Sequence, residues 1–356
     1  MQVIRKNEIE TPALLVDLDI LESNIRKMAE SFQGKRAMLR PHFKIHKCAR
    51  IAHMQLAAGA KGLSCAKLSE AEVLATSGVN DILIANQIVD SQKVYRLARL
   101  AKNARITVCV DNTDNVAELS KAADACSSTI HVLVELEVGL NRCGVETNEE
   151  VLKLAKQISS SKGLVFEGFQ AYAGHVCHLL DKEDRLRGTQ KAEAIVKEKK
   201  EYVEAAGLEV KEISGAGTGT YNIHGNYDLW TEIQAGAYVF MDTNYCKLNL
   251  GFGQSLTVLT GIIHKRSGIA ITDAGLKTCS NEAGPPVILG YPELPVVLHE
   301  EHGNIIDKND ELRYRQKLEY MPSHCGCSVN LHDHYYCVRN DMLEAIWPIS
   351  ARGYSK

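Results

Sequence analysis

Three features common in membrane, secreted and nucleic-acid-binding proteins are missing from this sequence. No stretch approaches the roughly 20 consecutive apolar residues of a membrane helix, and the first ten residues, MQVIRKNEIE, lack the apolar core of a signal peptide. The formal net charge is −3 with both signs interspersed, which offers no basic surface to a nucleic acid. We therefore expect a cytoplasmic protein with neither a membrane nor a nucleic acid as partner.

Signs of a disulfide framework, of internal repeats and of a low-complexity linker are missing as well. The 11 cysteines form an odd, scattered set, which favours reduced thiols in the absence of an export signal. Only Cys325 and Cys327 form a tight cluster. Hydrophobic residues make up 45% and charged residues 24% of the 356 positions, as in ordinary globular proteins. The chain should fold throughout.

What is present is a regular alternation of strand and helix patterns. Segments with helical periodicity and capping residues, such as NEEVLKLAKQISS, separate eight apolar runs of β type. Eight βα units predict a closed parallel barrel of the (β/α)₈ TIM type. The eight runs are 13–18, 38–44, 62–66, 81–86, 106–110, 130–136, 165–172 and 210–216.

The pattern of apolar residues changes after about residue 245. Short alternating runs such as LTVLTGIIHKRSGIAITDAGL and LPVVLHEEHGNIID are broken by Gly, Pro and Asn, with little helical pattern. This is typical of an antiparallel β domain. We expect a barrel over 13–245 and a mainly antiparallel β domain over 246–356, with residues 1–12 packing on the β domain.

Lys44 is the first candidate for chemistry. It ends the second run, and catalytic groups in such barrels come from the C-terminal ends of strands. Its context, RPHFKIHK, surrounds it with Arg40, His46 and Lys47. Crowding by like charges would lower its pKa toward what a Schiff base needs. From the octapeptide alone, a solvated basic edge is an equally good interpretation.

The second candidate is the segment SGAGTGTY, 214–221, after the eighth run. Barrels commonly build a phosphate site there from backbone N–H groups and small hydroxyls. The alternating glycines do not fit a dinucleotide fingerprint, and no P-loop lysine follows, so nucleotide binding is not indicated. Taken alone, the segment could also be a flexible turn. A lysine after run two and a phosphate cradle after run eight suit a cofactor that spans the barrel mouth.

At this point the sequence resembles the fold-type III enzymes that use pyridoxal phosphate (PLP), within the D-threonine aldolase and D-serine dehydratase group, whose N-terminal barrel is alanine racemase-like. The resemblance covers nearly the whole chain and implies a homodimer. It rests on ten motifs in the family's order: TPALLVDLDILESNI, RPHFKIHK, CAKLSEAEVL, EVGLNRCGV, FQAYAGHVCH, SGAGTGTY, EIQAGAYVFMD, DAGLK, EEHG and PSHCGCSVNL.

The resemblance also implies roles for single residues. Lys44 would form the Schiff base, Arg142 would reach the phenolic oxygen of the cofactor, and Tyr172 would line its ring. Gln234 stands where the alanine racemase branch has an arginine that faces the pyridine nitrogen. His178 matches a histidine proposed as the base for the β-hydroxyl proton. The residues that would hold the phosphate are Ser214, Gly217, Thr218, Gly236 and Ala237.

For a metal, the resemblance implies a histidine and, two residues on, an Asp or Cys. The histidine is His324, and the second position falls on Gly326, which has no side chain to offer. We expect Cys327 to replace the missing ligand, with Cys325 as the alternative. Equally, the site could be lost, or water and substrate oxygen could complete it around His324 alone. Thiolate with imidazole suits zinc better than magnesium or manganese. The ion would activate the β-hydroxyl as a Lewis acid; His302 is assigned no role.

The function predicted from the resemblance is retro-aldol cleavage of a β-hydroxy-D-amino acid to glycine, or a related amino acid, and an aldehyde. The alternative is dehydration of D-serine or a 3-hydroxyaspartate to a keto acid and ammonia. A racemase would need a second base, for which no matching tyrosine motif is found. A non-catalytic PLP-binding protein would have the barrel alone, whereas here a second domain follows.

Overall fold

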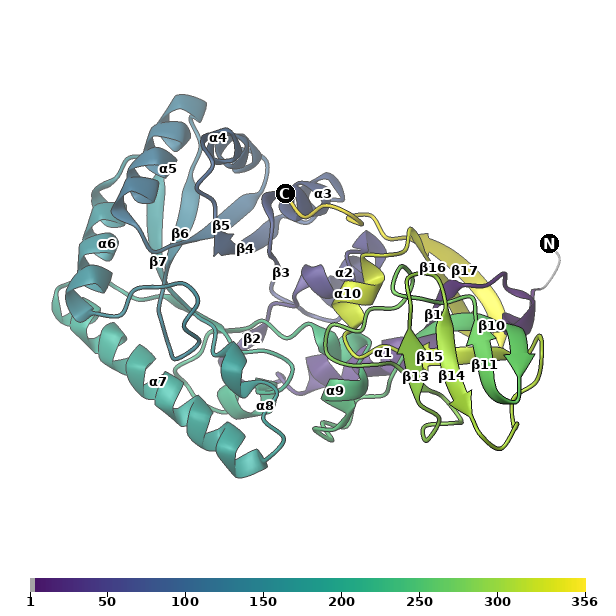
Figure 1. The fold of residues 1–356 in the computed structure, drawn as a ribbon. Coiled ribbons are helices and arrows are strands. Elements are labelled where there is room, and N and C mark those ends of the chain that lie inside the picture. The colour runs from purple at the N-terminus through teal and green to yellow at the C-terminus, as the bar shows by residue number, and fades with distance from the viewer. Residues whose placement is uncertain (1–3) are drawn as a thin grey trace. The chain divides into compact units, whose positions relative to one another are not determined.

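The computed structural model describes residues 4–356, which pack as two compact units (Figure 1). We call them the barrel unit and the sheet unit. The barrel unit consists of Ala29–Lys44, Ile51–Gly236 and Tyr354–Lys356. The sheet unit consists of the described residues up to Met28, with Ile45–Arg50 and Ala237–Gly353.

The barrel unit contains eight parallel strands in the order β2-β9-β8-β7-β6-β5-β4-β3. The ends of this order meet, because the N–H groups of Lys61 and Ser64 each donate over 2.9 Å to the carbonyls of Leu39 and Pro41. The predicted (β/α)₈ class is therefore confirmed. The strands are β2 (Met38–Leu39), β3 (Leu63–Cys65), β4 (Asp81–Gln87), β5 (Arg105–Val110), β6 (Ile130–Glu135), β7 (Leu164–Ala171), β8 (Glu212–Gly215) and β9 (Glu232–Ile233).

Helices follow the barrel strands where the periodicity predicts them. In the helix over Asn148–Ser160, Thr147 and Glu150 form a capping box at the N-terminus, and Val151, Leu154 and Ile158 are buried on one face. The helices that follow barrel strands are α2 (Ala49–Ala57), α3 (Leu68–Thr76), α4 (Ser91–Leu100), α5 (Thr113–Cys126), α6 (Asn148–Ser160), α7 (Lys182–Ala205) and α8 (Tyr221–His224), whereas α1 (Leu18–Glu30) precedes the first barrel strand.

One strand assignment is wrong. The first apolar run forms β1 (Ala13–Asp17), which pairs with strands of the sheet unit and not with the barrel. Four of its five residues are buried, and a continuous apolar run of this kind does not reveal which sheet it joins. The eighth barrel strand is instead the two-residue β9, too short to leave a pattern. The domain limits of 13–245 and 246–356 stay a prediction.

The sheet unit is built around β1, which lies between β10 and β16 in the order β13-β14-β11-β10-β1-β16-β17. Only the β1–β16 pair is parallel, so the prediction of a mainly antiparallel β domain is confirmed. The strands are β10 (Leu256–Arg266), β11 (Gly268–Thr272), β12 (Val287–Ile288), β13 (Val296–Leu298), β14 (Gly303–Asp307), β15 (Lys317–Met321), β16 (His334–Arg339) and β17 (Met342–Pro348).

Residues before β1 pack on this sheet. Ile9 joins a buried apolar cluster with Leu15, Leu259 and Val338, and the Lys6 ammonium lies 2.8 Å from the Glu319 carboxylate. Residues 1–3 of the predicted N-terminal segment lie outside the described residues. The sheet unit also carries two short helices, α9 (Thr243–Cys246) and α10 (Cys325–Val329).

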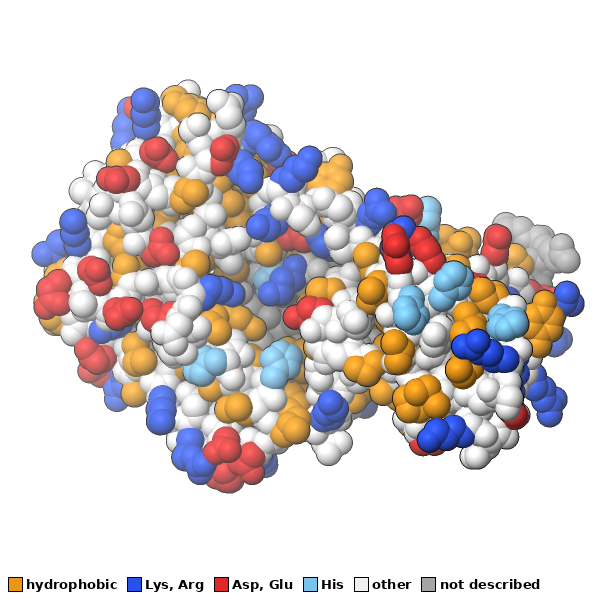
Figure 2. Space-filling model, viewed as in Figure 1, with side chains coloured by type: hydrophobic (Ala, Val, Ile, Leu, Met, Phe, Trp, Pro, Cys, Tyr) orange, Lys and Arg blue, Asp and Glu red, His pale blue; other side chains and the backbone are white. Residues whose placement is uncertain are grey.

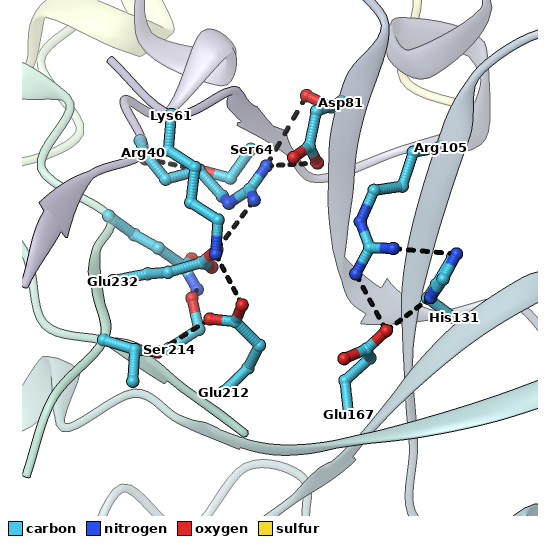
Figure 3. Close-up of polar contacts among 12 residues, drawn as sticks. Arg40, Lys61, Ser64, Asp81, Arg105, His131, Glu167, Glu212, Ser214 and Glu232 are labelled. Atoms are coloured by element: carbon cyan, nitrogen blue, oxygen red, sulfur yellow. Dashed lines mark hydrogen bonds and ion pairs between the residues drawn. The ribbon is translucent and has the colours of Figure 1, made fainter. Parts of the chain in front are cut away.

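The N-terminal ends of the barrel strands carry a network of buried charges (Figure 3). The Arg40 guanidinium lies 2.9 Å from Asp81 and 2.7 Å from Glu232, and the latter carboxylate is also 2.7 Å from the Lys61 ammonium. On the neighbouring strands, Glu167 contacts Arg105 and His131. Charges at this end of such a barrel belong to its stability, because the active sites lie at the other end.

Three expectations from composition can be compared with the fold. On the face shown in Figure 2, basic and acidic side chains are interspersed. Within residues 4–356, no disulfide links any of the eleven cysteines. Over the same residues, no helix is both long enough and apolar enough to span a bilayer.

Candidate active site

Five of the predicted site residues lie at or just beyond the C-terminal ends of barrel strands. Lys44 lies in the short 3₁₀ helix η2 (Phe43–Ile45) after β2, and Arg142 in the loop after β6. Tyr172 and Gln234 directly follow β7 and β9, and Ser214 lies within β8. Strand ends therefore bring residues from distant parts of the chain to one end of the barrel.

Tyr172 lies at the centre of this group. The Lys44 ammonium nitrogen is 6.0 Å from its ring centroid, and the central carbon of the Arg142 guanidinium is 5.5 Å from it. Gly174 and Gly217 approach the same ring: a Cβ added to them would lie 2.6 Å and 3.6 Å from ring carbons. The structure thus brings together Lys44, Arg142, Tyr172 and the glycine segment.

The surroundings of Lys44 favour its neutral amine. Solvent reaches the side chain, yet enclosure by protein lowers the pKa of the amine, and the positive charge of Arg142 lowers it further. Glu70 and Cys177 act in the opposite direction. A neutral amine is the form that attacks an aldehyde carbon.

The source of this pKa shift differs from the one that the sequence suggested. Arg40 does not crowd Lys44, because its buried guanidinium is held by the carboxylates of Asp81 and Glu232 near the N-terminal ends of the strands. The lowered pKa of Lys44 comes from enclosure and from Arg142, which is distant in sequence. The octapeptide alone does not show this.

A buried carboxylate that the sequence did not single out holds Arg142. Glu135, the last residue of β6, places one carboxylate oxygen 3.4 Å from the Arg142 guanidinium, and its other oxygen accepts a 2.6 Å hydrogen bond from the Gln87 amide. Gln87 also donates to Asp111, which accepts the N–H of Gly144. The sequence could have pointed to Glu135 and Gln87, because both are polar residues at the ends of barrel strands.

The glycines of SGAGTGTY do not all have the same role. A Cβ on Gly215 would lie 2.1 Å from the Ala171 carbonyl oxygen, and one on Gly219 would lie 1.8 Å from the Cys177 carbonyl oxygen. These two glycines are required for the packing of this segment against the end of β7. Gly217 meets only the Cys177 thiol, at 3.2 Å, and the Tyr172 ring. It therefore leaves main chain, without a side chain, beside the ring.

The other predicted phosphate residues are buried near strand ends. Ser214 accepts a 2.8 Å hydrogen bond from the Gln234 amide nitrogen, which also donates to Gln170 over 2.6 Å. Thr218 is buried within the glycine segment. Gly236 follows β9, and the buried Ala237 begins the 3₁₀ helix η4 (Ala237–Val239).

The loop after β7 carries two histidines. The predicted base His178 is exposed on the turn that follows the 3₁₀ helix η3 (Gly174–Val176). His175 was passed over in the sequence; a Cβ on Gly139, in the loop after β6, would lie 3.1 Å from its Nε2. His175 therefore packs beside the loop that carries Arg142.

The predicted metal ligands lie in the sheet unit. His324 and Cys327 offer donor atoms that lie within 4.8 Å of each other and of a carboxylate oxygen of Glu282, which the sequence did not suggest. Cys325, the alternative, is buried, and its N–H donates to the Asp242 carboxylate. His302 lies at the start of β14 and is exposed.

A parallel barrel that gathers a lysine of lowered pKa, an arginine and a tyrosine beside a glycine segment is the architecture of a barrel enzyme that binds PLP through a lysine. Comparison with known proteins agrees with this class. The family model of the alanine racemase N-terminal domain matches residues 16–244, and that of a putative serine dehydratase domain matches residues 255–338.

Several aldolases are similar to this chain over nearly its whole length. A 3-hydroxy-D-aspartate aldolase of Paracoccus denitrificans (strain Pd 1222) is 39% identical over 98% of this chain and 93% of its own length. A D-threonine aldolase of Arthrobacter sp is 39% identical over 98% of this chain and 94% of its own. The crystal structure of D-threonine aldolase from Filomicrobium marinum has a TM-score of 0.97 at 35% identity, covering 100% of this chain and 99% of that one.

The chain therefore belongs to the D-threonine aldolase and D-serine dehydratase family of alanine racemase-like PLP enzymes, and it is a lyase that acts on small amino acids. Dehydratase relatives are more distant in sequence than the aldolases.

Proposed function

We propose that this enzyme cleaves a β-hydroxy-D-amino acid by a retro-aldol reaction, giving glycine or a related amino acid and an aldehyde. The observation that carries the proposal is the grouping of Lys44, Arg142 and Tyr172 at the barrel mouth, in a chain whose relatives at 37–39% identity are aldolases. PLP supplies an electron sink for the pair of electrons left on Cα when the Cα–Cβ bond breaks.

Several residues at or beyond the C-terminal ends of the barrel strands would hold the cofactor. Lys44 would bind its aldehyde carbon, Arg142 would donate to its phenolic oxygen, and Tyr172 would line its ring. Gln234 would face the ring nitrogen as a neutral amide, which Ser214 and Gln170 hold in place through its amide nitrogen. The phosphate would lie against Ser214, Gly217, Thr218, Gly236 and Ala237.

The proton chemistry is assigned to a histidine. As the Cα–Cβ bond breaks, the β-hydroxyl oxygen becomes the aldehyde carbonyl and gives up its proton. We assign this proton to His178, since an imidazole with an ordinary pKa near 6.5 accepts protons close to neutrality. A proton returned to Cα then completes the glycine. His324 and Cys327 would hold a divalent ion, which would supply Lewis-acid activation of the hydroxyl.

Two relatives of equal identity act on different compounds, as a 3-hydroxy-D-aspartate aldolase and a D-threonine aldolase. We take both compounds as candidate substrates. Dehydration of D-serine or a 3-hydroxyaspartate is the alternative reaction.

One experiment separates these reactions. The purified protein with PLP is incubated with D-threonine, D-phenylserine, D-serine and 3-hydroxy-D-aspartate, and aldehyde, glycine, keto acid and ammonia are each assayed. Glycine with one equivalent of aldehyde supports the proposal. Keto acid with one equivalent of ammonia, without glycine, would show that the enzyme is a dehydratase.

The assembly and location of the enzyme also belong to this proposal. We infer a homodimer in the cytoplasm, the dimer because the family resemblance implies it. We also infer that no nucleic acid is a partner, because the charges are mixed and the net charge is −3. Sedimentation at micromolar concentration tests the dimer. A fully active monomer would contradict it.

A further inference from the structure

The sheet unit contains a set of metal donors that differs from the family's pattern. The pattern expects a ligand two residues after His324, but this position is Gly326. Glu282, in the segment between β11 and β12, and Cys327, in α10, instead place their donor atoms within 4.8 Å of each other and of the His324 imidazole. An exposed thiol, a half-buried imidazole and an exposed carboxylate therefore converge where a ligand was lost.

The missing ligand would have pointed at the same place. A Cβ added to Gly326 would lie 3.2 Å from Cε1 and 3.6 Å from Nδ1 of His324. Position 326 thus borders the imidazole directly, and Cys327 is its neighbour in α10. The donor atom of this next residue already lies within 4.8 Å of the His324 donor atom.

The segment that carries Glu282 is fixed against α10. The N–H of Ser280 donates over 3.0 Å to the Ser328 hydroxyl, and the His332 ring nitrogen lies 2.7 Å from the Thr278 carbonyl oxygen. Within the segment, the Glu282 N–H donates over 3.2 Å to the Ser280 hydroxyl. Two contacts from α10 and its C-terminal turn therefore hold the segment beside the helix that carries Cys327.

We propose that Glu282, His324 and Cys327 bind one Zn²⁺ ion, with Glu282 and Cys327 replacing the ligand that is absent at Gly326. One sulfur, one nitrogen and one oxygen donor suit the tetrahedral zinc ion, whose fourth position stays open to solvent or substrate. Mg²⁺ and Mn²⁺ prefer oxygen donors and gain less from a thiolate. The inference does not depend on the proposed reaction, because zinc binding is measured without substrate.

Zinc binding has a consequence for α10. Nδ1 of His324 accepts the N–H of Cys327 over 3.2 Å as the N-cap of this helix. A neutral imidazole has one acceptor nitrogen, so a metal on Nδ1 replaces this hydrogen bond, and a metal on Nε2 moves the proton to Nδ1 and also breaks it. Binding therefore releases the Cys327 N–H.

The test uses the PLP-loaded protein stripped of metal with a chelator. Zinc affinity is measured by competition with a chromophoric chelator, and Co²⁺ is added as a spectroscopic probe. We expect one Zn²⁺ per chain, tighter binding of Zn²⁺ than of Mn²⁺, and a near-ultraviolet thiolate-to-cobalt charge-transfer band. Cys327→Ser should abolish the band and weaken zinc binding at least roughly tenfold. Mutation of a residue that only hydrogen-bonds to a metal ligand already lowers metal affinity by about that factor.

Matched variants make the assignment specific. Glu282→Gln should weaken zinc binding and keep the cobalt band, whereas Cys246→Ser and Glu293→Gln, elsewhere in the sheet unit, should leave both unchanged. Tighter binding of Mn²⁺ than of Zn²⁺, or an unchanged band in Cys327→Ser, would overturn the proposal.

A double variant tests the exchange of ligands directly. Gly326→Asp with Cys327→Ser restores the carboxylate of the family pattern and removes the thiol. The added Cβ would come no closer than 3.2 Å to its neighbours, so the helix should accept it after a small shift. We expect the preference for Zn²⁺ over Mn²⁺ to fall. An unchanged preference would mean that Cys327 does not select the metal.

Discussion

The carboxylate of Glu135 lies 3.4 Å from the guanidinium of Arg142, on the arginine that faces both Tyr172 and Lys44. Glu135 is buried, and burial raises its pKa although Arg142 and Gln87 counteract this shift. The relationship makes Glu135 a positioning residue: it holds Arg142 without touching the reacting atoms.

We expect Glu135→Gln to lower kcat/KM roughly tenfold, a loss of about 1.4 kcal/mol of transition-state stabilisation. Without the carboxylate, the charge of Arg142 is less balanced and its position less fixed. The pH profile of turnover should shift as well, which a purely structural defect would not cause. Steady-state kinetics across pH, with the exposed Glu146→Gln as control, measure this. An unaltered profile with normal kcat/KM would rule out the positioning role.

Lys44→Ala should abolish both the visible absorption band of the PLP-loaded protein and its turnover, because no other amine in the group around Tyr172 can take its place. Absorption spectra and product assays measure the two effects. The exposed Lys156→Ala serves as the control and should behave like the original protein. Full activity of Lys44→Ala would show that the lysine is misassigned.

Arg142 should set the pH at which Lys44 reacts with PLP. The guanidinium lowers the pKa of the amine, so Arg142→Gln should raise that pKa and shrink the neutral fraction at any given pH below it. The midpoint for uptake of PLP by the cofactor-free protein should therefore move to higher pH. Stopped-flow spectra across pH give the midpoint. A downward shift would contradict this explanation.

The three glycines of SGAGTGTY should respond differently to alanine. Gly219→Ala puts a Cβ 1.8 Å from the Cys177 carbonyl oxygen, which should destabilise the fold by roughly 3 kcal/mol or more. Gly217→Ala meets a thiol at 3.2 Å, so its melting temperature should change little while its affinity for PLP falls. Thermal unfolding and PLP titration separate the two effects. Equal melting temperatures in the two variants would argue against distinct roles.

The charge network in the barrel unit predicts loss of stability in acid. Burial opposes ionisation of Glu167, but hydrogen bonds from His131 and Arg105 lower its pKa from the usual 4.5 to about 2. A carboxylate with a lowered pKa stabilises the fold fully above the unfolded value and loses that contribution as the pH falls through its folded value. Between these two pKa values the contribution of Glu167 should decline by about 3 kcal/mol at most.

Glu167→Gln should therefore be less stable near neutrality and should lose less stability on acidification than the original protein. Urea unfolding at a series of pH values measures both, and the exposed Glu149→Gln is the control. If the variant and the original protein lose stability in parallel, Glu167 does not contribute to the acid transition.

The sequence predicts features that depend on residues close to one another along the chain. Lys44, Tyr172 and the glycine segment each stand at the end of a strand that the apolar pattern marks. Glu282 could not be found in this way, because a hydrogen-bonded loop from a distant part of the chain brings it to α10. The contact between Glu135 and Arg142 could be predicted only in part. The position of Glu135 at a strand end makes it a candidate in the sequence, but only the fold shows that its partner is Arg142.

The place of β1 was missed for a related reason. Its apolar run would suit either sheet, and its partners β10 and β16 begin more than two hundred residues later. The two-residue β9 closes the barrel through contacts with β2 and β8 rather than through any pattern of its own. For β1 and β9, hydrogen bonding to distant strands therefore decides which sheet the strand joins.

The position of β1 between β10 and β16 also affects how the protein is made. During synthesis, β1 leaves the ribosome long before β10 and β16 have been made. Its apolar side chains therefore stay exposed until those strands can pair with it. Long-range pairing of this kind is slow. A fragment that ends after the barrel would leave both edges of β1 open to other chains. Expression of the barrel alone should therefore begin after this strand, and a truncated chain that ends before β16 should aggregate more readily than the full chain.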